Sequence, residues 1–322
     1  YCVDRASGLL LFIPPEDFDA SSVLQLSMME EVMVAMEGCA HIRFENLIFE
    51  NARGSAVYIE EGESNTLAGC TFRNLGILAV QMGQGIEPFP YGKHDACGNK
   101  ADGKPGVPAS RIMGSWHEHI YRFTAWNRKA GRNHHVLSCD IHHTGAGGIM
   151  LGGGDRKTLT PGNNTVENCD IYQVNRLERT YKAPVNVDGV GNRIVNNRIH
   201  DTEGMGIYLH GNDHLIEFNR IYNVLMDMSD QGAIYMGRDP SESGTMIRHN
   251  FLYDIVNRHK GGHGVQAIFF DDMCTFGATI TGNVFVRAGS TGVVKFHGGG
   301  DSPIINNIMV DCPRGLQKAN CS

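Results

Sequence analysis

A short apolar pattern recurs through most of the chain, and this repeat constrains the fold more than any other feature of the sequence. Each copy sets two apolar residues on either side of one variable position, which is typical of a short strand with one buried face. The six clearest copies are Gly148–Leu151, Pro184–Val187, Gly206–Leu209, Ala233–Met236, Ala267–Phe270 and Val293–Phe296.

A second recurring phrase, an Asn or Cys two residues before an apolar residue, marks the spacing of the repeat. Apart from a gap of 69 residues between Cys70 and Cys139, successive copies are separated by 22 to 33 residues. Repeats of this length indicate stacked units that bury their apolar faces against one another. The copies begin at Asn46, Cys70, Cys139, Cys169, Asn197, Asn219, Asn250, Asn283 and Asn307.

Each repeat unit holds short alternating strands with turn residues between them and no long stretch of helical periodicity. The sequence therefore predicts an all-β chain, a right-handed parallel β-helix of about nine rungs, rather than a helical solenoid. We expect residues 1–38 to form a cap that covers the open end of the coil, because terminal units need protection. Residues 39–322 then form the β-helix, interrupted by a long insertion at about residues 83–133 that contains Trp116 and Trp126.

Composition excludes two classes of partner. The net charge of −7 and the pI near 6.1 leave no basic surface for nucleic acid. No apolar run reaches the ~20 residues that a membrane span needs.

The chain begins at Tyr1 without an initiator methionine, so we expect a processed or excised segment. No cysteine or histidine spacing predicts a zinc site, and Cys70, Cys139 and Cys169 are expected to be buried free thiols.

Alternation along the strands sorts the side chains into inward and outward files. In the copy at 206–209, Ile207 and Leu209 point inward, whereas Tyr208 and then His210 point outward. The Asn and Cys residues of the second phrase share one inward position, so they should stack along the coil. There an Asn can bond its turn and its stacked neighbours, whereas a Cys fills the position as a small hydrophobic residue.

Equal offsets from the strands predict outward columns of polar residues. Because neighbouring rungs lie ~4.8 Å apart, groups one rung apart can touch. The first column places Asp271 beside His297, and the second places Arg238 beside Asp272. A third column brings Glu203 and Asp230 side by side. The first column contains Glu60, Gly83, Gly152, Asp188, His210, Gly237, Asp271 and His297.

These columns concentrate acids, histidine and arginine among glycines, a composition that favours a ligand site over an ordinary solvated surface. Glycoside cleavage needs one carboxylic acid and one carboxylate. Two pairs are open at this point, Asp230 with Asp271 or Glu203 with Asp230. We expect the substrate to be held by Asp188, Glu203, Tyr208, His210, Tyr235, Arg238, Asp272 and His297.

Three stretches carry a resemblance to a known family: GGGDRKTLTPGNN at 152–164, GNDHLIEFN at 211–219 and DQGAIYMGRD at 230–239. They resemble right-handed parallel β-helix proteins of carbohydrate-degrading bacteria, in particular glycoside hydrolase family 141. The resemblance implies a glycosidase of α-L-fucosidase or xylanase type that acts on a polysaccharide or oligosaccharide. It also implies a secreted, periplasmic or cell-surface location, and a catalytic pair at Asp230 and Asp271.

Two other functions remain open from the sequence. A polysaccharide lyase would need a base such as Lys295, Arg238 or His297 and a neutraliser for a uronate group. That neutraliser could be Ca²⁺ held by Asp271, Asp272 and Asp239; a hydrolase needs no metal or cofactor. A non-catalytic structural or binding protein of the cell surface would instead have its cleft filled by the insertion.

Overall fold

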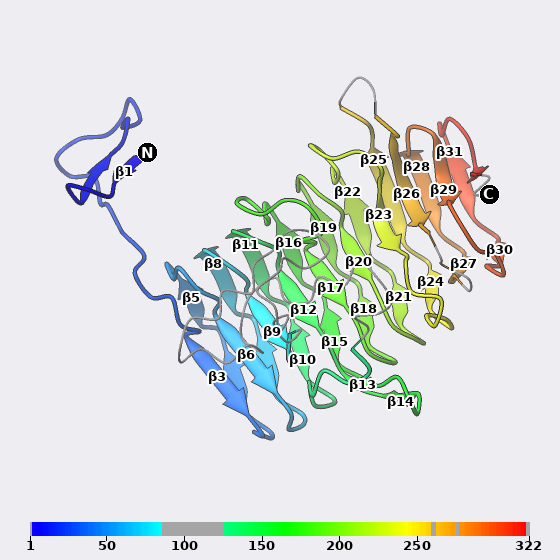
Figure 1. Cartoon of the computed structure of the whole chain (residues 1–322), viewed down its shortest axis with the longest axis horizontal. Helices are drawn as coiled ribbons and strands as arrows, with labels where there is room; N and C mark the ends of the chain where they lie inside the picture. The colour runs from blue at the N-terminus through cyan, green and yellow to red at the C-terminus, as the bar shows by residue number, and fades with distance from the viewer. Residues whose placement is uncertain (1, 86–124, 259–261, 273, 275–276, 320–322) are drawn as a thin grey trace.

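Three long parallel sheets run the length of the molecule and enclose its core (Figure 1). The computed structural model describes residues 2–85, 125–258, 262–272, 274 and 277–319. The protein is an all-β, right-handed parallel β-helix, as the repeat predicts. No helix long and apolar enough to cross a membrane occurs in these ranges.

The three sheets are named here in the order in which one turn of the coil visits them. Sheet 1 has ten strands: β3 (Val34–Glu37), β6 (Val57–Glu60), β9 (Val80–Met82), β12 (Ile149–Leu151), β17 (Val185–Val187), β20 (Ile207–Leu209), β23 (Gln231–Met236), β26 (Val265–Phe270), β29 (Gly292–Phe296) and β32 (Leu316–Lys318). Sheet 2 has nine: β4 (Arg43–Glu45), β7 (Thr66–Ala68), β10 (His135–Leu137), β15 (Thr165–Glu167), β18 (Arg193–Val195), β21 (Leu215–Glu217), β24 (Met246–Arg248), β27 (Thr279–Thr281) and β30 (Ile304–Ile305). Sheet 3 has nine: β5 (Ile48–Glu50), β8 (Thr71–Leu75), β11 (Asp140–Thr144), β16 (Asp170–Tyr172), β19 (Arg198–His200), β22 (Arg220–Tyr222), β25 (Phe251–Ile255), β28 (Val284–Ala288) and β31 (Ile308–Val310).

One rung takes one strand from each sheet, for example β20, β21 and β22, before the chain returns to sheet 1 at β23. The nine strands of sheets 2 and 3 give nine such rungs, and β32 begins another turn within the described ranges. Inward residues of the strands, such as Ile207, Ile216 and Ile221, are fully buried and form one continuous apolar core. Stacking therefore completes a core that no rung could bury alone.

A ladder of asparagine side chains runs inside the coil at the turn before sheet 3, as the second sequence phrase predicts. The Nδ2 of Asn197, Asn219, Asn250 and Asn283 each donates to Oδ1 of the next asparagine, the last being Asn307, at 3.0 Å. The same position is continued by the thiols of Cys70, Cys139 and Cys169, which are buried and free. The expected place of Asn46 in this ladder is wrong. Thr71 bonds the carbonyl of Leu47, so Leu47 lies opposite Cys70 and the first rung is displaced by one residue.

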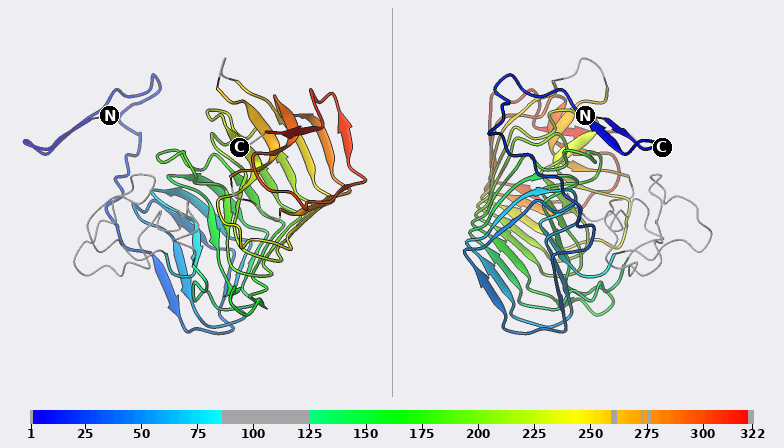
Figure 2. Two further views of the ribbon diagram at one scale, coloured as in Figure 1. Left: turned by 45° about the vertical axis from the view of Figure 1, so that its right-hand side comes forward. Right: turned by 90° about the vertical axis from the view of Figure 1, so that its left-hand side faces the viewer.

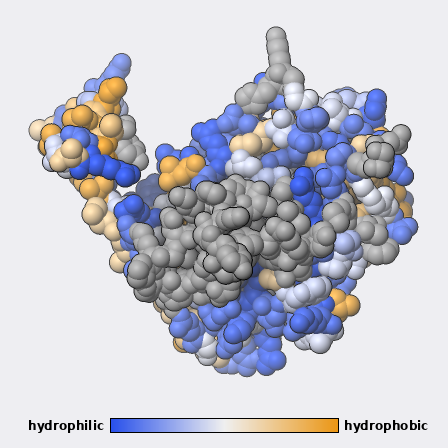
Figure 3. Space-filling view, in the orientation of Figure 1, coloured by the Kyte–Doolittle hydropathy of each residue, from blue (hydrophilic) through white to orange (hydrophobic). Residues whose placement is uncertain are grey.

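The N-terminal hairpin does not cover the open end of the coil. Its strands β1 (Cys2–Asp4) and β2 (Leu9–Leu11) form an antiparallel hairpin that stands away from the first rung (Figures 1 and 2). The apolar side chains of residues 9–13 are exposed, and they gather on this hairpin in Figure 3. The chain contacts the first rung at Gln25, whose Oε1 accepts from Nδ2 of Asn51, and then at Met29, whose carbonyl accepts the backbone N–H groups of Arg53 and Gly54. The capping role predicted for residues 1–38 is therefore not performed by the hairpin.

A second hairpin, β13 (Gly154–Asp155) with β14 (Thr160–Pro161), leaves the edge where sheet 1 ends. Most of the insertion expected at 83–133 lies outside the described residues, including Trp116. Its described end includes Trp126, whose ring lies 5.5 Å from the guanidinium carbon of Arg156.

Candidate functional site

The residues that follow the strands of sheet 1 form one file along its carboxyl edge, as the equal offsets predict. The last residues of β17, β20, β23, β26 and β29 pair with one another in register. The next residues along the chain, Asp188, His210, Gly237, Asp271 and His297, therefore occupy equivalent places on successive rungs. The structure divides this file into an open cluster and a buried cluster.

The open cluster, called the Asp271 cluster below, contains Tyr235, Arg238, Asp271, Asp272 and His297. Nδ1 of His297 lies 2.9 Å from Oδ1 of Asp271 and 2.8 Å from Oδ1 of Asp272. Arg238 approaches the other oxygens of the two carboxylates, each at 3.7 Å. The adjacencies predicted from the columns, Asp271 with His297 and Arg238 with Asp272, are both confirmed.

The two carboxylates of this cluster differ in exposure. The Asp271 side chain is 9% exposed and accepts a hydrogen bond at Oδ2 from the hydroxyl of Tyr235. The Asp272 side chain is 41% exposed. A buried, fixed carboxylate therefore stands next to one that can reach solvent or a ligand.

Electrostatics keeps Asp271 ionised. Burial alone would raise its pKa, but hydrogen bonds from Tyr235 and His297 and the charge of Arg238 outweigh burial and lower it. Burial, followed by the charge of neighbouring groups, raises the pKa of Tyr235 well above its usual value. At neutral pH the cluster therefore contains a protonated phenol that donates to a carboxylate.

A buried cluster holds the other part of the file. Asp188 forms an ion pair with Arg128, and both side chains are 2% exposed. His210 is also buried, with Nδ1 2.8 Å from Oε1 of Glu242. The expectation that Asp188 and His210 face a ligand is not supported by the described contacts. Side chains from the insertion and from the turn after β23 cover both residues.

The pKa values of this buried cluster follow from the same competition between burial, which opposes ionisation, and neighbouring charges and hydrogen bonds. Burial opposes ionisation of Asp188, but Arg128 and Arg156 overcome it and hold its pKa at about 2. For Glu242, burial exceeds the effect of His210, and its pKa is raised. Arg156 contributes further bonds, with Nη1 3.1 Å from Asp239 and Nε 2.9 Å from Oδ1 of Asn212. These contacts tie the β13–β14 hairpin to the rungs.

The aromatic residues on the outer face of sheet 1 have the predicted alternation but not the predicted exposure. Tyr208 is 3% exposed and Tyr235 is 1% exposed. Tyr181, from the loop that precedes β17, lies over them with ring centroids at 5.7 Å and 6.0 Å. Nζ of Lys295 lies 4.2 Å from the ring centre of Phe269 on the same face. The described rings therefore pack against the protein rather than present an open platform for a sugar.

Asp230 and Glu203 lie at the opposite edge of sheet 1, before its strands begin. Their predicted adjacency is wrong, because the backbone N–H of Asp227, not Asp230, bonds the carbonyl of Glu203. Glu203 to Asp227 spans 24 residues, whereas the paired Ile207 and Ile234 are 27 apart, so this turn holds three additional residues.

The predicted catalytic pair is not assembled by the described contacts either. Asp230 precedes β23, whereas Asp271 follows β26, which pairs with β23 along its whole length. The six strand residues between their levels give seven intervals of ~3.3 Å, so the two backbones lie roughly 23 Å apart along the strand direction. Asp230 instead contacts Nζ of Lys295 at 3.4 Å.

No family model matches this chain, and no curated protein matches it. The chain is similar in backbone fold to three solved carbohydrate-active proteins. A structure of XylC with xylose has 12% identity and a TM-score of 0.46, covering 92% of this chain and 55% of that one. A structure titled glycoside hydrolase has 12% identity and a TM-score of 0.45, covering 82% and 38%. The A-module of the mannuronan C-5 epimerase AlgE6 of Azotobacter vinelandii has 9% identity and a TM-score of 0.43, covering 86% and 59%.

The chain thus spans between 38% and 59% of the length of these three proteins. At such identities the similarity concerns the course of the backbone and not the side chains of a site. Membership of glycoside hydrolase family 141 is not shown by these matches and stays a prediction.

The donor set of the Asp271 cluster does not fit the Ca²⁺ site considered for a lyase. One atom from each of Asp271, Asp272 and His297 lies within 4.8 Å of the others, which is a possible metal-binding arrangement. Ca²⁺, however, prefers six to eight oxygen ligands, and here one donor is an imidazole nitrogen while Arg238 supplies a competing positive charge. Asp239, the third expected ligand, is buried against Arg156.

Sequence reasoning missed Arg128 and Glu242, because neither belongs to a strand or to a column of the repeat. Arg128 lies near the end of the insertion, and Glu242 lies in the turn after β23. A weak signal existed for Glu242, since that turn is longer than the turns after β17 and β20. Loops that differ in length between rungs are where a solenoid places its specific groups.

Proposed function

We propose that this protein is a carbohydrate-active enzyme that hydrolyses glycosidic bonds of a polysaccharide or oligosaccharide at the Asp271 cluster. One observation carries the proposal: an oxygen of Asp271 and an oxygen of Asp272 lie within 4.8 Å of one another beside His297. In retaining glycosidases the two carboxyl groups are typically ~5–5.5 Å apart, whereas inverting enzymes separate them by ~6.5–9.5 Å.

The environments suggest a role for each carboxylate. Asp271 is ionised, fixed by Tyr235 and His297, and suited to attack the anomeric carbon. Asp272 is the more exposed and suited to protonate the leaving oxygen, with His297 in contact with both groups. Water would then attack the covalent intermediate with Asp272 as base, releasing the sugar and restoring both carboxyl groups. This pair replaces Asp230 and Asp271 in the proposal.

Arg238 would orient the two carboxylates and offset their mutual repulsion, because it lies 3.7 Å from an oxygen of each. In this role it is a positioning residue. A location outside the cytoplasm, where polymeric glycans are met, is part of the same proposal.

The test compares the wild type with Asp271→Asn, Asp272→Asn and Asp230→Asn on neutral and uronate polysaccharides, and follows new reducing ends. The first two substitutions should lower kcat by at least about 10²-fold, and Asp230→Asn should change it little. The proposal fails if Asp271→Asn retains wild-type activity. It also fails if Asp230→Asn is the variant that loses activity while the Asp271 and Asp272 variants keep it.

A polysaccharide lyase is the second candidate, favoured by two basic groups on the same sheet. The Lys295 side chain is 8% exposed and contacts Asp230, and Arg238 flanks the carboxylates on an earlier rung. A lyase would use His297 or Lys295 to remove a proton next to a uronate carboxyl group. Its product would be an unsaturated sugar, which absorbs ultraviolet light. If this absorbance appears together with new reducing ends, the protein is a lyase and not a hydrolase. Absence of activity on every glycan would favour a non-catalytic role.

A further inference from the structure

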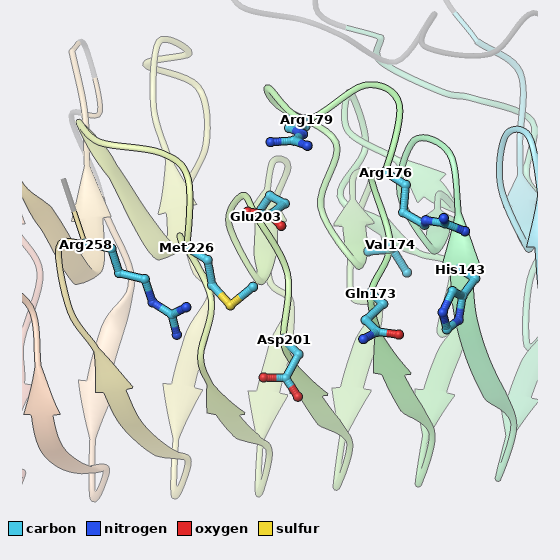
Figure 4. Close-up of a pocket in the computed structure, with 9 residues that line it drawn as sticks. All are labelled: His143, Gln173, Val174, Arg176, Arg179, Asp201, Glu203, Met226 and Arg258. Atoms are coloured by element: carbon cyan, nitrogen blue, oxygen red, sulfur yellow. The ribbon is translucent and has the colours of Figure 1, made fainter. Parts of the chain in front are cut away.

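A polar pocket lies away from the Asp271 cluster, along the turn between sheet 3 and sheet 1. Its volume is about 710 Å³. Glu203 and Met226 line it from turns that precede strands of sheet 1, whereas the Asp271 cluster follows such strands at the opposite edge. The lining residues are His143, Gln173, Val174, Arg176, Arg179, Asp201, Glu203, Met226 and Arg258 (Figure 4).

The pocket extends across successive rungs rather than into the protein. Figure 4 shows His143, Gln173, Asp201, Met226 and Arg258 one after another along the coil. They come from the end of β11 and from the turns after β16, β19, β22 and β25. Four intervals of ~4.8 Å give a length of roughly 19 Å. Such a length suits a linear chain of several sugar units better than a single sugar.

Arginines dominate the charge of this pocket. Arg179 is engaged by Asp227, and Asp201 is engaged by His200 at 2.7 Å. Arg176 and Arg258 form no side-chain hydrogen bond or ion pair within the described part of the chain.

Of the acidic side chains that line the pocket, Glu203 forms no side-chain hydrogen bond or ion pair with the residues that the structure describes. Among the pocket's charged groups without a side-chain partner in these ranges, two are guanidinium groups and one is a carboxylate, so their net charge is positive. Both arginines are exposed, so their guanidinium groups are available to an external anion.

The groups around these arginines can serve a sugar chain. A guanidinium group presents a planar fork of donors that matches carboxylate or sulfate oxygens. The amide of Gln173 can bond hydroxyl groups, and Met226 offers an apolar wall for a ring face. Burial, with the nearby charges of His142 and Arg176, lowers the pKa of His143, so a neutral ring is available as a further partner.

We propose that this pocket is a binding site for a linear anionic oligosaccharide, whose acidic groups contact Arg176 and Arg258. The acidic groups can be carboxylates of uronates or sulfate esters, because both present the same geometry to a guanidinium. Glu203 lies in the same pocket as the arginines and accepts hydrogen bonds from hydroxyl groups of the oligosaccharide. The site stands whether or not the Asp271 cluster is catalytic.

The experiment measures binding by titration calorimetry at low ionic strength, in the Asp271→Asn background so that turnover cannot intervene. The probes are tetragalacturonate, a sulfated tetrasaccharide and the neutral xylotetraose. The test variant is Arg176→Gln/Arg258→Gln. The matched control is Arg220→Gln, an exposed arginine on β22 outside the pocket.

At least one anionic probe should bind, and the neutral probe should bind at least about tenfold more weakly. The double substitution should weaken the anionic probe by at least about tenfold, since two charge-assisted contacts are lost, whereas Arg220→Gln should leave it unchanged. Binding of tetragalacturonate alone assigns the site to uronates, and binding of the sulfated probe alone assigns it to sulfate esters.

The proposal is overturned if neither anionic probe binds, if xylotetraose binds equally well, or if the double variant binds like the control. Thermal unfolding of each variant checks that the fold is intact. Loss of the proposed hydrolase activity would be seen in the reducing-end assay and would leave this binding result untouched.

Discussion

Tyr235 donates its hydroxyl hydrogen to Oδ2 of Asp271, which lies one rung further along the coil. The bond joins the outer face of sheet 1 to its carboxyl edge, and it is one of the contacts that keep the pKa of Asp271 below its usual value.

Replacing Tyr235 by Phe should therefore move the acid limb of the pH–activity profile. Asp271 acts in its ionised form, so activity falls as the pH drops through its pKa. Removing one donor raises that pKa, so the limb should shift to higher pH. Tyr58→Phe is the matched control, because its hydroxyl bonds Glu60 far along the same face. An unchanged limb in Tyr235→Phe would contradict the assigned role of Asp271.

Gly237 lies between two members of the file, and its lack of a side chain is required by the neighbouring rung. A Cβ added there would stand 2.7 Å from Cβ of Asp271 and 3.1 Å from its Cα. Gly237→Ala should displace Asp271 and lower kcat by about 10²-fold. Gly300→Ala, which meets nothing within 4 Å, should retain activity. Equal kcat values for the two variants would show that Asp271 need not hold its present position.

The asparagine ladder should make a large contribution to stability. Asn250 is 1% exposed, and its Nδ2 donates to the carbonyl of Ile216 at 2.9 Å and to Oδ1 of Asn283 at 3.0 Å. Asn250→Ala removes the donor to the carbonyl of Ile216 and the Oδ1 that accepts both the backbone N–H and Nδ2 of Asn219, so it should lower the free energy of unfolding by about 2 to 4 kcal/mol. Asn250→Asp should cost more at pH 7, because it sets a buried negative charge against acceptors. Urea denaturation measures both variants, and a loss below about 0.5 kcal/mol would refute a structural role for the ladder.

His214 should make the fold less stable in mild acid. Burial lowers its pKa to about 4, and its Nδ1 accepts the backbone N–H of Asn192 at 3.1 Å. The unfolded chain, with a pKa near 6.5, binds the proton more readily between these values. The part of the free energy of unfolding that depends on a neutral His214 is therefore fully present above pH 6.5. It is lost as the pH falls towards 4, by about 3 kcal/mol in total.

Urea denaturation between pH 7 and pH 4 checks this dependence. His214→Gln should flatten the fall in unfolding free energy over this window, whereas His41→Gln, at an exposed position, should not. A wild type whose stability stays constant from pH 7 to pH 4 would show that the ring of His214 is not held neutral.

Much of the architecture could be read from the repeat. Strand alternation and constant offsets predicted the register of sheet 1, the asparagine ladder, and the contact of Asp271 with His297. These features depend on position along a regular strand, and a strand with a period of two fixes which residues share a face.

The partners of each residue could not be read in this way. Glu203 and Asp230 were placed together by an offset that three additional turn residues break. The offsets predict that Asp188 and His210 face outward to a ligand. In the structure they are buried by contacts with Arg128 and Glu242, which lie in loops outside the repeat.

The sequence alone determined the coil and the file of residues along its edge, because both follow from a local periodicity that every rung shares. Only the tertiary structure decided which members of the file are open and which are buried. That choice depends on loops of unequal length, and their side chains reach the file across distances that no repeat in the chain encodes.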